Sequence, residues 1–140
     1  MSQIVLPPDV ALWATQYLRS HLTDMPRLQI DVSEPPDWDG STPLAVLTDI
    51  PGSCAARVTW DWTLAVTVRM GTRQDTKPCR DLAARIMGLL TADPQVQTAA
   101  GSPICEIVDD STTGPSLVTE DHDTARYYLT VDYTVYGHIQ

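Results

Sequence analysis

The chain of 140 residues lacks the features that mark membrane and secreted proteins. Nowhere are there 18 consecutive apolar residues, and the N-terminus has no basic stretch followed by an apolar one. We therefore expect neither a transmembrane helix nor a secretory signal. The three cysteines, Cys54, Cys79 and Cys105, are odd in number and far apart, which argues against a disulfide framework and a paired-cysteine metal site. These absences predict a soluble protein made in a cytoplasm, with buried thiols.

Catalytic motifs are also missing. The sequence has no GxSxG elbow, no P-loop and no GxGxxG motif. Cys79 lies beside Lys77 and Arg80 at a predicted helix start, which favours a nucleophile, but it also begins an apolar stripe that should point into the core. Asp61 and Asp132 fall on the polar faces of two predicted strands, where we expect a hydrated sheet face rather than a catalytic pair. We predict no enzyme and no cofactor.

Basic side chains are scarce and unevenly placed. The formal net charge is −9, Lys77 is the only lysine, and segment 86–125 holds seven acids and no Lys or Arg. Phosphate neutralisation needs a net basic face, so this balance excludes a general nucleic-acid binder. Five basic residues against two acids in segment 69–85 give a local balance of +3. This basic strip consists of Arg69, Arg73, Lys77, Arg80 and Arg85.

The densest group of possible metal ligands is Glu120-Asp121-His122-Asp123. Asp109 and Asp110 would approach it if the flanking strands pair as a hairpin. Such oxygen ligands suit a hard cation, yet the group lacks the spaced carboxylates and the glycine of a calcium loop. A solvated acidic loop is the favoured interpretation, and no metal site is predicted.

Two long runs alternate between apolar and polar side chains, as half-buried strands do. They span residues 58–70 and 125–136, about twice the usual strand length. At roughly 3.3 Å per residue the first would reach about 40 Å, slightly more than the roughly 37 Å width of a compact domain of this size. We therefore expect it to bend or to project. We predict that its Trp60 to Leu64 portion lies in the core and that its end near Arg69 and Arg73 reaches a neighbouring subunit.

The remaining pattern completes an α+β domain. Helices are predicted over 10–22, with Asp9 as N-cap, and over 77–90, with Asp75 or Thr76 as N-cap and Pro78 in the first turn. Shorter elements are strands at 28–32, 44–50 and 104–108, a helical turn at 94–100, and loops at 35–43 and 109–123. The order is α-β-β-β-α-β-β, a single domain over 1–140 with two main helices and a mostly antiparallel sheet. Trp38 lies in the proline-rich loop 35–43 and is a candidate interface anchor.

Four segments in this order resemble the tail terminator, or tail completion, proteins of long-tailed bacteriophages. They are PPDVALWATQYLRSHL, VTWDWTLAVTVRM, GTRQDTKPCRDLAARIMGLL and ARYYLTVDYTVYGH. The resemblance implies a structural virion protein of the tail or neck, assembled in the host bacterial cytoplasm. It implies a hexameric ring that caps the tail tube, stops its polymerisation and provides the surface to which the head connector docks. It implies no catalytic residues.

The charge pattern independently favours head-to-tail contact, because unlike surfaces on one chain can meet between copies and close a ring. The predicted contact joins Arg73, Lys77 and Arg80 of one subunit to Asp109, Asp110 or Glu120 of its neighbour. Arg69 and Trp38 complete the predicted interface. DNA would pass through such a ring without specific binding, since surplus negative charge repels phosphate.

Three alternatives stay open at this point. The nearest is another neck component, such as a head-closure or connector protein, which would share size and ring habit. A small cytosolic metal-dependent enzyme using the acidic loop is the second. A monomeric binding module is the third, and the mass in solution distinguishes it from a ring.

Overall fold

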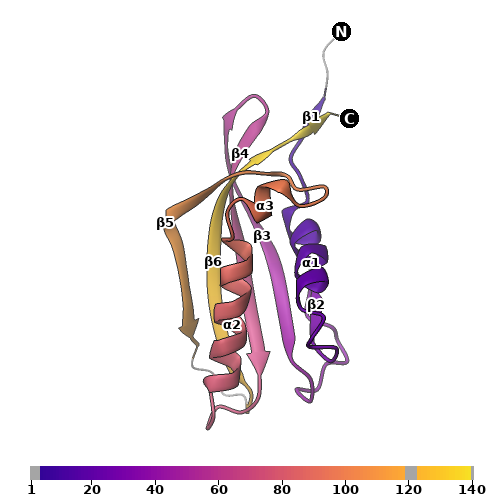
Figure 1. Ribbon diagram of the computed structural model, residues 1–140, viewed down its shortest axis with the longest axis vertical. Helices are drawn as coiled ribbons and strands as arrows, with labels where there is room; N and C mark the ends of the chain where they lie inside the picture. The colour runs from indigo at the N-terminus through magenta and orange to yellow at the C-terminus, as the bar shows by residue number, and fades with distance from the viewer. Residues whose placement is uncertain (1–3, 119–122, 140) are drawn as a thin grey trace.

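The computed structural model describes residues 4–118 and 123–139 and forms a single α+β domain (Figure 1). Its three helices are α1 (Val10–His21), α2 (Lys77–Leu90) and α3 (Gln95–Thr98). Its strands are β1 (Val5–Leu6), β2 (Gln29–Asp31), β3 (Leu44–Ala56), β4 (Thr59–Met70), β5 (Ile104–Leu117), β6 (Ala125–Tyr136) and β7 (His138–Ile139). The predicted fold class and the predicted order of the main elements are confirmed. No helix within the described ranges is both long and apolar enough to cross a membrane.

Five strands form the main sheet in the order β2-β3-β4-β6-β5. Only β2 and β3 run parallel, and the other neighbours are antiparallel. The two predicted long strands lie side by side at its centre, where β4 and β6 pair over twelve positions from Thr59↔Tyr136 to Met70↔Ala125. Long unbroken alternation therefore specifies the centre of this sheet.

The helices of the described chain lie on one face of the sheet and cover its apolar side (Figure 1). Every second residue of β4 and β6 points into this core, including Leu64, Leu129 and Tyr133, each at most 1% exposed. The α2 helix contributes a stripe at three- and four-residue spacing that includes Leu82, Ile86 and Leu90. One continuous core thus sits between the sheet and the helices.

Local signals explain where both main helices begin. The Asp9 side chain accepts a hydrogen bond from Leu12 N at 3.1 Å, so Asp9 is the N-cap of α1 as predicted. Thr76 occupies the N-cap position of α2, and Pro78 stands in the first turn, where its missing N–H is not needed.

Two buried tyrosines complete the end of α2, which has no basic residue in its last turn. The Tyr17 hydroxyl donates to Leu89 O at 2.9 Å, and the Tyr133 hydroxyl donates to Leu90 O. Burial raises the pKa of both phenols, so each stays a neutral donor. These bonds tie α1, α2 and β6 together around carbonyls that a helix end leaves without partners.

The prediction that the strand at 44–50 ends at Pro51-Gly52 is wrong, because β3 continues to Ala56. Pro51 still pairs with Trp62, and irregularities on both sides of Cys54 absorb the extra residues. A Cβ on Gly52 would lie 2.7 Å from the backbone oxygen of Asp61. The glycine therefore permits a close approach of two strands inside a bulged hairpin rather than a chain reversal.

The predicted loop over 109–123 is wrong for a similar reason, because β5 runs to Leu117. Its pairing with β6 shifts between Val108 and Thr113 and again between Thr113 and Ser116. Gly114 has φ +98°, and a Cβ there would lie 2.8 Å from Tyr128 O. The Gly-Pro dipeptide thus marks a bulge in an edge strand.

The β3–β4 hairpin extends beyond the helices and ends in an exposed tip (Figure 1). We call residues 50–58 the arm. At its tip, Gly137 N donates to Val58 O at 2.7 Å, and β1 and β7 form a small separate sheet beside it. The sequence pattern gave no sign of β1 or β7, each of which has only two residues. The arm and the two small strands share one end of the molecule.

Candidate functional site

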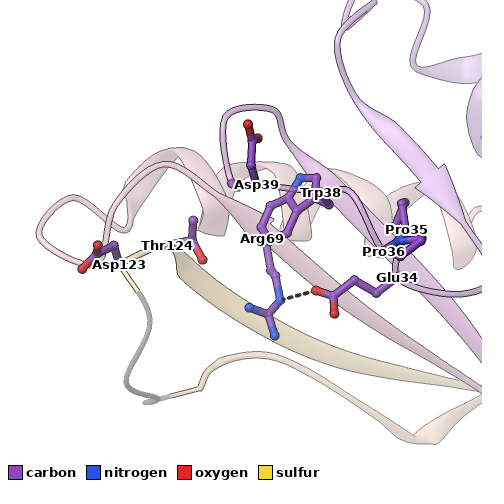
Figure 2. Close-up of a pocket in the computed structure, with 9 residues that line it drawn as sticks. Glu34, Pro35, Pro36, Trp38, Asp39, Arg69, Asp123 and Thr124 are labelled. Carbon is purple, nitrogen blue, oxygen red and sulfur yellow. Dashed lines mark ion pairs between the residues drawn. The ribbon is translucent and has the colours of Figure 1, made fainter.

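Trp38 and Arg69, two of the predicted interface residues, lie together in one pocket at the far end of β4 from the arm (Figure 2). The pocket has a volume of about 450 Å³ and is walled by Pro35 and Pro36 on one side. The Arg69 guanidinium carbon lies 5.8 Å from the centre of the Trp38 ring, within cation–π range. Arg69 Nε also lies 3.8 Å from a carboxylate oxygen of Glu34.

Trp38 and Arg69 are both held in place by contacts inside their own subunit. Trp38 Nε1 donates to Thr42 O at 3.0 Å, which fixes the indole, and the Arg69 side chain is only 14% exposed. The end of β4 at Arg69 is therefore packed into the body, whereas the expectation was that it projects. Trp38 is half-buried rather than a fully exposed anchor.

The rest of the basic strip is exposed but partly neutralised. Lys77 Nζ lies 2.6 Å from Asp81, and Arg80 Nε lies 3.9 Å from the same carboxylate. These contacts lower the pKa of Asp81, chiefly through the hydrogen bond from Lys77. The exposed Arg73 side chain makes no ion pair with a described residue, although its backbone N–H donates to Asp123 O at 2.9 Å. Arg73 is thus the cation of this strip with the most freedom to meet another molecule.

The predicted acidic partners lie elsewhere on the subunit. Asp109 and Asp110 are exposed on β5, in the bulged stretch between Val108↔Asp132 and Thr113↔Thr130. Within residues 4–118 and 123–139 neither forms an ion pair. Glu120 lies outside the described residues. Asp109 and Asp110 occupy the edge strand, whereas Arg73 follows the end of a central one, so the two charged surfaces are separate.

The described residues form no candidate metal site. No group of three or more His, Cys, Asp or Glu side chains converges among them. The β5–β6 hairpin does form, but Asp109 and Asp110 lie near the Asp132 register, while Leu117 pairs with Tyr127 next to the acidic loop. Of that loop, Glu120, Asp121 and His122 lie outside the described residues. The hairpin therefore does not carry Asp109 and Asp110 to its acidic end.

Cys79, the candidate nucleophile, is fully buried. Its Sγ lies 3.3 Å from Val68 O and 3.5 Å from Ala125 O. Burial is the main cause that raises the pKa of the thiol, so the nucleophilic thiolate is disfavoured. The predicted core position of Cys79 is confirmed, whereas the prediction of buried thiols is wrong for Cys54, which is exposed, and for Cys105, which is half-buried.

The face of the sheet that the helices leave uncovered carries short hydroxyl side chains. Thr63 Oγ1 donates to Asp132 at 2.6 Å, and the hydroxyls of Thr113 and Thr130 lie 2.7 Å apart. Asp61 lies beside this network, with a longer contact of 3.4 Å from Ser53 Oγ. The two strand aspartates are thus held by separate hydroxyls and not by each other.

Asp49 is a half-buried carboxylate that the sequence interpretation missed. One of its oxygens accepts hydrogen bonds from Ala11 N and from Trp62 Nε1, each at 2.9 Å. Desolvation is the largest influence and raises the pKa of Asp49, against the lowering effect of these two bonds. The only available signal was an acidic residue inside the apolar segment LAVLTDI. Asp49 joins the start of α1 to β3 and β4, which makes it a positioning residue for the base of the arm.

Comparison with models of known protein families finds no match, and comparison with curated proteins finds none either.

Proposed function

We propose that this protein is a structural virion component that assembles head to tail into a ring, with six subunits as the expected number. The ring caps the tail tube of a long-tailed phage, ends its polymerisation and provides the surface for head joining. The observation that carries the proposal is the separation of unlike exposed surfaces on one subunit. Asp109 and Asp110 lie on the edge strand without an ion pair in the described chain, and Arg73 lies beyond the end of β4.

Such a distribution supports contact between copies because Asp109, Asp110 and the Arg73 side chain form no ion pair with a described residue of their own subunit. A heterologous contact of this kind closes into a ring when the rotation between copies allows it. Electrostatic complementarity also fixes the register of the contact and disfavours wrong partners. The surplus of negative charge elsewhere suits a pore past which DNA slides.

Reversing the charge of Arg73 tests the contact between copies. The Arg73→Glu variant should fold normally and lose the ring, which light scattering and native mass spectrometry would report as a fall to the mass of one chain. Arg27→Glu is the matched control, since Arg27 is also exposed and the change in charge is identical. Rings that survive in Arg73→Glu, or that disappear equally in both variants, would contradict the proposed contact.

Tube assembly tests the function itself. The tail-tube protein of the phage that encodes this chain should polymerise into shorter tubes when the ring is added, and electron microscopy should place the ring at one tube end. Unchanged tube length with no ring at either end would overturn the proposal. Binding inside the connector, away from the tube, would assign the protein to another neck position.

A further inference from the structure

Two adjoining hollows form a groove beside α1, and Trp13 lines both. The first has a volume of about 400 Å³ and includes Tyr17 and Ala100, and the second, of about 320 Å³, includes Asp9 and Tyr136. We call this combined hollow the α1 groove. Hollows of this size accept side chains of a bound segment.

Trp13 gives the groove an unused hydrogen-bond donor. Its side chain is 7% exposed and stacks on Tyr17, with ring centres 5.1 Å apart. Two other tryptophans, Trp38 and Trp62, donate their indole N–H to Thr42 O and Asp49. No acceptor for Trp13 Nε1 occurs in the described chain. Trp13 Nε1 is not among the fully buried side-chain atoms that lack a hydrogen-bond partner in the described chain, so it is open to the groove, where it can donate to a carbonyl oxygen of an incoming chain.

The arm has the matching chemistry. Its exposed residues include Ile50, Arg57 and Val58. The β2 strand covers β3 only from Leu44 to Val46, so the outer edge of β3 beyond Val46 has no strand partner in the described chain. Unpaired carbonyls on such an edge are ready acceptors for a donor on another chain.

The charges of the groove and the arm, and their positions on the subunit, both favour the arm of a second copy as the occupant. Among the described residues that line the α1 groove, Asp9 is the only carboxylate and none is Lys or Arg. Arg57 is the one basic residue of the arm. The α1 groove and the arm lie at the same end of the subunit. Pro103, Tyr136 and Gly137 line the groove, and Gly137 N donates to Val58 O of the arm. A second copy that lies beside the first in the same orientation therefore has its arm at the level of this groove.

From these observations we infer that the α1 groove of one subunit receives the arm of a second copy. Trp13 Nε1 donates to a backbone carbonyl of the incoming arm, Arg57 of that arm pairs with Asp9, and its apolar side chains lie against the aromatic wall. The inference rests on the proposed self-assembly and adds a second contact, distinct from the one through Arg73.

Cross-linking through native Cys54 tests the contact. Cys54 lies in the arm and Ala100 is exposed at the groove, so Ala100→Cys places a thiol opposite the incoming arm. On mild oxidation this variant should yield roughly tenfold or more intermolecular disulfide than Gln95→Cys, whose exposed position lies outside the groove lining, because docking raises the effective concentration. Adding Cys54→Ser should abolish the product, and wild type gives the background.

The pattern of products separates this inference from the proposed ring. A series of cross-linked products that ends at the mass of a closed ring supports both the arm contact and the ring. Covalent dimers alone support the arm contact but contradict the ring. Rings detected in solution without any Cys54 cross-link to Ala100→Cys would overturn the arm contact and leave the ring standing. Equal cross-linking in Ala100→Cys and Gln95→Cys would also overturn it. Arg57→Glu should reduce the cross-link to background while the melting temperature stays unchanged.

Discussion

The two ends of β4 serve different purposes although the same alternation runs through both. At the Met70 end, Arg69 is packed between Glu34 and Trp38, and α2 follows soon after. At the Thr59 end the strand stays paired with β6 as far as Tyr136, and the residues just before Thr59 form the exposed arm (Figure 1). Binary patterning alone does not separate the two, because it reports which side chains share a face and not what covers that face.

The difference implies that core packing and docking of the arm are encoded in separate parts of the β3–β4 hairpin. Substitutions in the core should change the free energy of unfolding, whereas substitutions in the arm or at the exposed Arg73 should change association only. Five stability measurements test this division.

The largest effect is expected at Leu64, which is fully buried in the core. Leu64→Ala should lower the free energy of unfolding by about 2–5 kcal/mol, because it removes buried methyl groups and leaves a cavity. Val58→Ala, at a position 47% exposed on the same hairpin, should change it by less than about 0.5 kcal/mol. Urea denaturation measures both, and equal losses would refute the division.

A smaller effect is expected at Asp49, at the base of the arm. Asp49→Ala leaves Ala11 N and Trp62 Nε1 without their acceptor, which should cost about 1–3 kcal/mol. Asp49→Asn keeps an oxygen that accepts both bonds and removes the charge. We expect Asp49→Asn to melt at or above the wild-type temperature at neutral pH and Asp49→Ala to melt below it. Melting of Asp49→Asn below the wild-type temperature would show instead that the charge of Asp49 stabilises the fold.

The difference in stability between the wild type and Asp49→Asn should depend on pH. Because burial raises the pKa of Asp49, the folded protein holds this proton more tightly than the unfolded chain does. The cost of ionising Asp49 is fully present above the folded pKa and is absent below the unfolded pKa. Stability of the wild type relative to Asp49→Asn should therefore increase as the pH falls through that window, and a decrease would contradict the assignment.

Tyr133 should show an effect of about 1 kcal/mol, since Tyr133→Phe removes only the hydroxyl that donates to Leu90 O. Tyr128→Phe is the control, because Tyr128 lies on the uncovered face of the same strand and is 36% exposed. Thermal unfolding should separate the two variants. If both lose the same stability, the Tyr133 hydroxyl does not anchor the end of α2.

The smallest effect is expected at Glu34, which is largely exposed and faces Arg69 at 3.8 Å. Glu34→Gln should reduce stability by less than about 1 kcal/mol, as exposed ion pairs usually do. High salt should remove the difference between variant and wild type. A larger loss that survives in high salt would mean that the Met70 end depends on more than packing around Arg69.

The sequence predicted the central elements because their signals are local and repeated. Alternation over twelve or more residues located β4 and β6, and Asp9 located the start of α1. Cys79 was correctly placed in the core because it begins the apolar stripe of α2.

The errors have one physical source, which is contact between distant segments. Pro51-Gly52 and Gly114-Pro115 resemble turns, yet both lie in bulged strands where a neighbouring backbone approaches the glycine. The groove at Trp13 depends on the loop after α3, and the packing of Arg69 depends on Trp38, so neither site follows from local periodicity.

The most direct test of the division between body and arm is the mass in solution of wild type and Arg57→Glu, each paired with its urea midpoint. The account predicts that the wild type assembles into a multisubunit ring as concentration rises and that Arg57→Glu keeps the mass of one chain. At a concentration where both proteins are single chains, their urea midpoints should be equal. Equal masses for the two proteins, or a wild type that stays a single chain at every concentration, would contradict it.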